Sequence, residues 1–115
     1  MSEQNDTIFG KILRGELPCD KVYEDDDIFA FRDINPAAPT HILVIPRERI
    51  VNLYAAEDEH EALLGKLMLG AKKVAELEGL DDFRLVVNNG TGAGQTVFHM
   101  HLHVIGGRPL EWPPG

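Results

Sequence analysis

Hydrophobic positions form five short segments that alternate with polar residues or run without interruption, as β-strands do. An acidic turn joins the first two into a hairpin, and Pro36 and Pro39 place an irregular loop before the third. That third segment is apolar except for His41, so we expect a buried strand with one polar residue. The predicted strands are 21–24, 28–32, 40–46, 83–88 and 99–105.

Two further segments show the three- and four-residue spacing of apolar positions that is typical of amphipathic helices. The first is short, with Asp6 or Thr7 as its cap, and ends near Gly15. The second runs from Glu57 to Glu78, and its apolar stripe is wide enough to cover a sheet and a second copy of itself. We therefore expect a homodimer. Because the order of elements lacks β-α-β alternation, we expect an α+β fold with a mostly antiparallel sheet.

Three of the five histidines alternate with apolar residues in the last predicted strand. Side chains of an extended chain point to opposite faces with a period of two, so a strand places His99, His101 and His103 on one face. A helix would separate successive members of this set by about 200°. The pattern predicts a strand that carries a ladder of imidazoles.

Such a ladder has three possible uses. The imidazoles could simply face water, or two of them could bind zinc together with His41. A site of all three is awkward, because the outer two lie about 13 Å apart along a straight strand and zinc holds nitrogen at about 2.0–2.1 Å. The third use is covalent catalysis, with one imidazole as nucleophile and its neighbours handling protons.

Composition narrows the class of protein. The 115 residues are 43% hydrophobic and 26% charged, which predicts one globular domain over residues 1–115. The net charge is −8 and basic residues do not cluster, so we expect no polymeric nucleic acid as a partner. The polar N-terminal residues and the lack of a long apolar run predict a cytoplasmic protein with no membrane partner. Cys19, the only cysteine, fits a reducing compartment.

A glycine-rich segment, residues 89–95, leads into the histidine strand. By itself it is a long hairpin loop. Residues without a Cβ atom also let backbone N–H groups approach an anion closely, and this loop ends beside His99. A ladder of imidazoles next to a possible phosphate cradle favours a phosphoryl or nucleotidyl centre.

The segment from Gly94 to Arg108, with its His-φ-His-φ-His-φ-φ pattern in which φ is apolar, resembles the signature of the histidine triad (HIT) superfamily. The segments 6–12, 38–46 and 112–115 are similar to those of its Hint branch, the histidine triad nucleotide-binding proteins. The likeness covers nearly the whole chain. It implies a HIT-like fold with a five-stranded sheet, one long helix and a short N-terminal helix, joined into a ten-stranded sheet in a homodimer.

The resemblance also implies an activity. Proteins of this branch cleave the P–N bond of adenosine or guanosine 5′-monophosphoramidates and can hydrolyse aminoacyl adenylates. They release AMP or GMP through a covalent nucleotidyl-histidine, and no cofactor is required. Two other classes stay open, a nucleotide-binding interaction module without turnover and a zinc-binding protein.

Roles follow for the positions that match. His101 would be the nucleophile, a choice that fits its place between two imidazoles, because nearby positive charge disfavours its protonation. His99 and His41 would form a hydrogen-bonded relay behind it. Trp112 would contact the leaving group or the partner subunit, and no metal is expected. The nucleotide would be bound by His101 and His103 together with Ile8, Phe9, Ile12, Phe31, Asp33, Ile34, Asn88, Gly94, Gln95 and Thr96.

Overall fold

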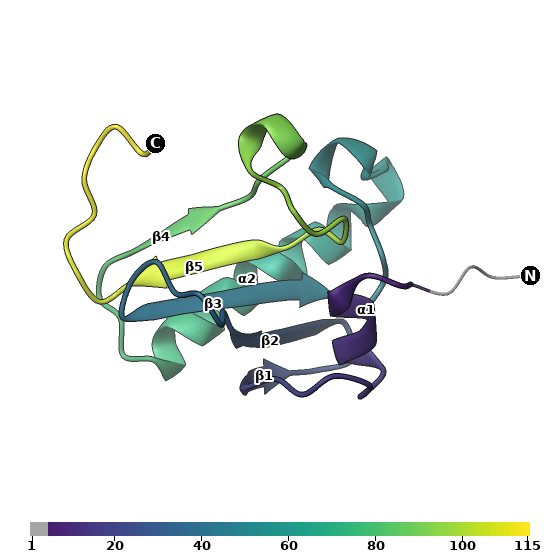
Figure 1. The fold of residues 1–115 in the computed structure, drawn as a ribbon, viewed down its shortest axis with the longest axis horizontal. Coiled ribbons are helices and arrows are strands. Elements are labelled where there is room, and N and C mark those ends of the chain that lie inside the picture. Colours follow the sequence, from purple (N-terminus) through teal and green to yellow (C-terminus); the bar gives the residue numbers. More distant parts are fainter. Residues whose placement is uncertain (1–4) are drawn as a thin grey trace, which may run out of the picture.

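The computed structural model describes residues 5–115; residues 1–4, part of the polar N-terminal stretch, lie outside the described residues. Five strands form one antiparallel sheet in the order β1-β2-β3-β5-β4 (Figure 1). This confirms the predicted α+β fold. The strands are β1 (Lys21–Glu24), β2 (Ile28–Arg32), β3 (Thr40–Pro46), β4 (Phe83–Val86) and β5 (Leu102–Gly106).

Two α-helices and three short 3-10 turns complete the part of the chain from residue 5 onward. Helix α1 (Ile8–Leu13) begins where the sequence predicts, because the Thr7 side chain accepts a hydrogen bond from the Gly10 N–H at 3.0 Å. Helix α2 (Glu61–Leu77) starts four residues later than expected, since residues 58–60 form a separate 3-10 turn. The other 3-10 turns are Leu53–Ala55 and Thr91–Ala93.

The boundaries of the last two strands differ from the predicted ones. Strand β4 ends at Val86, which leaves Asn88 in the loop that follows. Strand β5 begins at Leu102, so the prediction of a strand from His99 was wrong. The segment before it bends, because the Met100 N–H donates to the Ile50 carbonyl, outside the sheet.

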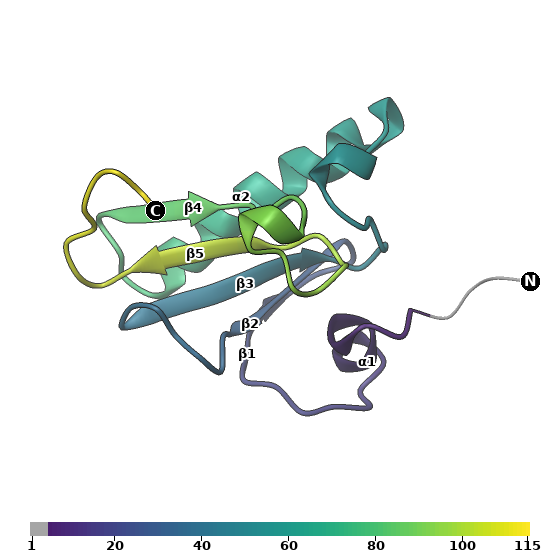
Figure 2. The same ribbon diagram turned by 45° about the horizontal axis from the view of Figure 1, so that its top comes forward.

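The helices lie on opposite faces of the sheet (Figures 1 and 2). Helix α2 covers one face and forms the larger core with side chains of β2, β3 and β5. Apolar surface removed from water in this layer is the main favourable contribution to folding. On the other face, Phe9 of α1 packs with aromatic and aliphatic side chains of β2 and β3 in a smaller cluster. The second face is only partly covered, which leaves room for a site.

Among residues 5–115, no helix has the length and apolar character that crossing a bilayer requires.

Two glycines of α2 give a matched test of how tightly this helix packs. A Cβ atom at Gly70 would lie 2.1 Å from Ile28 Cδ1, whereas one at Gly65 meets nothing within 4 Å. Gly65→Ala should raise the free energy of unfolding by about 1 kcal/mol, through helix propensity alone. Gly70→Ala should lower it by about 1–2 kcal/mol, since overpacking outweighs that gain. Urea unfolding of both variants measures the difference, and equal stabilisation would contradict close packing at Gly70.

Candidate active site

Two of the predicted ladder histidines share a face at the start of β5. The rings of His101 and His103 lie 5.0 Å apart, and His103 is opposite Leu43 of β3. His41, also on β3, reaches the same place, with its Nε2 atom 2.9 Å from His103 Nδ1. The sheet therefore brings His41, His101 and His103 together from distant parts of the sequence.

His99 does not belong to this group. Its ring is fully buried, Nε2 donates to the Pro46 carbonyl at 2.7 Å, and Nδ1 accepts from the Asn5 side-chain amide at 2.8 Å. Both ring nitrogens are thus used, and neither bonds to His41. The predicted relay between His99 and His41 was wrong, because the bend before β5 turns the His99 ring toward the end of β3. Burial lowers the pKa of His99, so its ring is neutral and connects the Asn5 side chain to the Pro46 carbonyl.

The main chain fixes the proton of His101. Its Nδ1 lies 2.8 Å from the carbonyl oxygen of His99. A carbonyl only accepts, so Nδ1 carries the hydrogen and Nε2 keeps its lone pair in the neutral ring. Burial also lowers the pKa of His101, against the opposing effects of the His99 carbonyl and the Asp33 carboxylate. His101 thus has an unprotonated nitrogen, which is the form that can attack an electrophile.

A directed chain of hydrogen bonds runs from the main chain through His41 to His103. The Ala37 N–H donates to His41 Nδ1 at 2.9 Å, so the hydrogen of the neutral His41 ring is on Nε2. That hydrogen points to His103 Nδ1, which leaves the hydrogen of His103 on its own Nε2. The chain therefore ends in a donor.

This last donor, His103 Nε2, has no partner. Among the described residues, no other buried side-chain nitrogen or oxygen lacks a hydrogen bond. Burial, together with the neighbouring His101 and His41, lowers the pKa of His103 to about 4. A buried unpaired donor costs about 1–3 kcal/mol, so this atom is suited to a ligand acceptor such as a phosphoryl oxygen.

A pocket of about 230 Å³ opens beside His101 and His103. It contains most of the residues expected to bind a nucleotide, and Phe9 stands edge-on to His101 with ring centroids 4.9 Å apart. Ile34 is 91% exposed and forms part of the rim. The predicted residues that line the pocket are Ile8, Phe9, Ile12, Phe31, Asp33, Ile34, Thr96, His101 and His103.

Four residues predicted to contact the nucleotide or the leaving group do not line this pocket. The Asn88 amide donates to the Ala93 carbonyl at 2.7 Å, and the Gly94 N–H is taken by the Thr91 carbonyl at 3.1 Å. Gln95 is buried, and its side chain bonds only to main-chain groups of the surrounding loops. Trp112 is 80% exposed and lies against Arg84. Ligand contacts of these four remain predictions.

The HIT domain family matches residues 14–110, which is most of the chain. The chain belongs to this family. It is 59% identical to an uncharacterized HIT-like protein of Synechococcus elongatus, over all of both chains. It is 53% identical to a 14 kDa zinc-binding protein of Brassica juncea, over 96% of this chain and 100% of the relative. The crystal structure of a HIT family hydrolase from Legionella pneumophila has a TM-score of 0.93 and 47% identity, covering 96% of this chain and 100% of that one.

One cluster of this HIT domain has the composition of a metal site. Asp33, His41 and His103 each offer one ligand atom, and these atoms lie within 4.8 Å of one another. A metal at His41 Nε2 would need the lone pair of that nitrogen. The Ala37 N–H occupies the Nδ1 lone pair and so keeps the hydrogen on Nε2. The hydrogen-bond chain therefore disfavours a cation at this position.

Sequence reasoning missed the groups that orient the histidines. Ala37, Asn5 and the Pro46 carbonyl fix the protons of His41 and His99. A backbone N–H or carbonyl has no signature in the sequence. Asn5 lies just before the predicted cap of α1, and its side chain also accepts from Thr7. That local turn is a signal that could have drawn attention to it.

The buried neutral histidines predict a loss of stability on acidification. Unfolded histidines bind a proton near pH 6.5, whereas burial lowers the folded pKa of His99 and His101 and brings that of His103 to about 4. Below about pH 6.5 the unfolded chain binds protons that the folded chain does not, so the free energy of unfolding falls as the pH falls toward 4. The loss is at most about 1.4 kcal/mol per pH unit for each histidine.

Urea unfolding at pH 7 and pH 5 measures this slope, and His103→Asn should make it shallower. A free energy of unfolding that is equal at the two pH values would contradict neutral burial.

Proposed function

We propose that this protein is a HIT-family hydrolase that cleaves the P–N bond of purine nucleoside 5′-monophosphoramidates. The products are AMP or GMP and an amine, and aminoacyl adenylates are related substrates. The observation that carries the proposal is the bond from His101 Nδ1 to the His99 carbonyl, which leaves Nε2 as the free nitrogen of a ring that lines the pocket.

The hydrogen-bond chain from Ala37 through His41 to His103 ends in a donor for the phosphate of the substrate. His103 Nε2–H is a fixed, unpaired donor next to the nucleophile, so it can bond to a phosphoryl oxygen without first reorganising. The Thr96 hydroxyl, at the same pocket, is a second donor. These donors offset the charge that builds on the phosphoryl oxygens during attack.

The remainder of the pocket suits a nucleoside. Its wall includes aliphatic and aromatic side chains against which a purine ring can pack, with Ile8 and Ile12 from α1 and Phe31 from β2. Asp33 also lines the pocket, and its Oδ2 lies 3.4 Å from His41 Nε2. A carboxylate accepts two hydrogen bonds at once, as the two hydroxyls of a ribose provide.

The reaction then has two displacements. His101 Nε2 attacks the α-phosphorus, an Nε2–P bond forms, and the P–N bond to the amine breaks while the amine takes a proton from solvent. Water next attacks the phosphorus and releases a proton to solvent, the Nε2–P bond breaks, and the nucleoside monophosphate leaves with the free enzyme restored. Splitting one difficult displacement in two is the advantage of a covalent intermediate.

A homodimer is part of the proposal. Strand β4 lies at an edge of the sheet, so its outer side can pair with another strand. Met68 and Leu69 of α2 are 56% and 67% exposed and offer apolar surface that a partner subunit can cover. Pairing β4 with its copy would give a ten-stranded sheet. Trp112 lies outside the pocket of its own chain, so the leaving-group contact proposed for it would be made in the partner subunit.

Trapping the intermediate tests the activity. Wild-type protein mixed with an adenosine phosphoramidate and quenched rapidly should gain the mass of one adenylyl group on His101, because its Nε2 keeps a lone pair whereas His103 Nε2 carries a hydrogen. His101→Ala should form no adduct and lose at least about 10³-fold in kcat, as expected when a nucleophile is removed. His60→Ala, which alters a histidine away from the pocket, is the control.

Equal amine release from wild type and His101→Ala would refute the proposed nucleophile. Tight AMP binding without wild-type turnover would favour a nucleotide-binding module instead. Activity that a strong chelator abolishes and zinc restores would favour the zinc-binding class, against the tautomer that Ala37 imposes on His41.

Light scattering on a sizing column tests the dimer. Wild type should have twice the chain mass of 12.8 kDa, and Leu69→Glu should shift it toward the monomer, because a buried unpaired charge opposes association. Leu17→Glu, at an exposed leucine outside α2 and β4, should leave the mass unchanged. A monomeric wild type would overturn this part of the proposal.

A further inference from the structure

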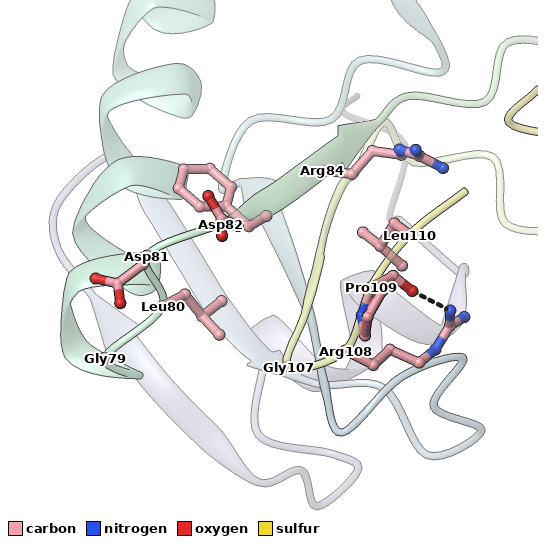
Figure 3. A pocket seen from close by; sticks show the side chains of 10 residues that line it. Gly79, Leu80, Asp81, Asp82, Arg84, Gly107, Arg108, Pro109 and Leu110 are labelled. Carbon is pink, nitrogen blue, oxygen red and sulfur yellow. Dashed lines mark hydrogen bonds between the residues drawn. The ribbon is translucent and has the colours of Figure 1, made fainter. Parts of the chain in front are cut away.

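Arg108 ties the end of β5 to the loop before β3. Its Nη2 donates to the Ala37 carbonyl and its Nη1 to the Pro109 carbonyl, both at 3.0 Å. Figure 3 shows the second of these bonds, at the edge of a wide hollow beside the turn between α2 and β4. The side chain is exposed and does not line the catalytic pocket. Its contact with Ala37 nevertheless reaches the first link of the histidine chain.

Ala37 has bonds on both sides. Its carbonyl is held by Arg108, and its N–H donates to His41 Nδ1 at 2.9 Å. The loop has no regular secondary structure, so the orientation of this residue depends on such bonds and on the burial of Ala38. Moving Ala37 would free His41 Nδ1 to take a proton or to exchange tautomers.

We propose that Arg108 is a positioning residue that fixes the direction of the hydrogen-bond chain from Ala37 through His41 to His103. The proposal rests on the function proposed above for its effect on turnover, but not for its effect on the tautomers. With Ala37 held, His103 presents Nε2–H to the pocket. With Ala37 released, His41 can accept at Nε2, and His103 can then lose its role as a fixed donor.

The charged and titratable groups around the chain act in opposite directions on that change. Asp33 Oδ2 lies 3.4 Å from His41 Nε2, and its negative charge raises the pKa of His103 against the larger effect of burial. His101 is the other titratable neighbour, with its ring 5.0 Å from that of His103. The Ala37 N–H occupies the lone pair of His41 Nδ1. Loss of its position should therefore raise the pH at which the chain takes up a proton.

The guanidinium fork explains why arginine suits this position. Two of its nitrogens bind two different carbonyls, so it connects residues 37 and 109 through one rigid plane. A lysine has one ammonium on a flexible stem and can keep the Ala37 bond alone. Arg108→Lys should thus retain more of the function than Arg108→Met, which keeps the stem and removes every donor.

The test compares Arg108→Met, Arg108→Lys and Arg47→Met. Arg47 is a matched control, since it donates to the Asp25 carbonyl at 2.7 Å on a surface away from the pocket. Nitrogen-15 NMR of the imidazoles reports the tautomers of His41 and His103 without substrate. The kcat, the KM and the pH profile of kcat are measured with an adenosine phosphoramidate.

Arg108→Met should lower kcat by about 3- to 10-fold, the range for one hydrogen bond, with KM changed less than kcat. Its acidic limb should move to higher pH, and His41 should show mixed or protonated signals. Arg108→Lys should restore part of the loss, and Arg47→Met should match wild type.

An Arg108→Met protein with wild-type kcat, pH profile and a single Nε2–H tautomer at His41 would overturn the proposal. If Arg108→Met fails to fold, the His41 signals of Arg108→Lys decide in its place. A wild type without turnover refutes the proposed function, while the tautomer measurement still tests Arg108.

Discussion

A neutral imidazole has one donor and one acceptor nitrogen, and main-chain groups decide which is which at His101 and His41, and through His41 at His103. The His99 carbonyl places the hydrogen of His101 on Nδ1, and the Ala37 N–H places that of His41 on Nε2. A carbonyl oxygen cannot donate and a backbone N–H cannot accept. The protonation pattern is therefore part of the backbone fold, and it exists before a substrate arrives.

The sheet gives these bonds their rigidity. Strands β3 and β5 are adjacent and central, so each has ladder hydrogen bonds on both edges. His41 and His103 project from one face of this pair, while alternate residues such as Ile42 and Val104 are fully buried against α2 on the other. A movement of these strands would disturb the close-packed core on the other face. A site on such strands is therefore held more precisely than one on loops.

Local patterns in the sequence predicted the strands and the first helix. Short apolar segments, alternating or continuous, located all five strands, and the expected cap at Asp6 or Thr7 located α1, because these signals arise within a few residues. The start of β5 was missed because the Met100 N–H bonds to Ile50 and the His99 ring to Pro46, contacts about fifty residues apart that no window contains. The roles of Ala37 and Gln95 were missed for a related reason: one acts through its backbone, and the other supports a loop from inside.

The same arrangement resolves a conflict between binding and reactivity. A protein with a net charge of −8 needs local groups to hold an anionic phosphate, and protonated imidazoles would hold it most strongly. Protonation, however, would remove the lone pair of the nucleophile and place a positive charge 5.0 Å from it on His103. Burial prevents this by lowering the pKa of both rings. Oriented N–H dipoles then replace charge, and a dipole that is already aimed costs little reorganisation when negative charge develops beside it.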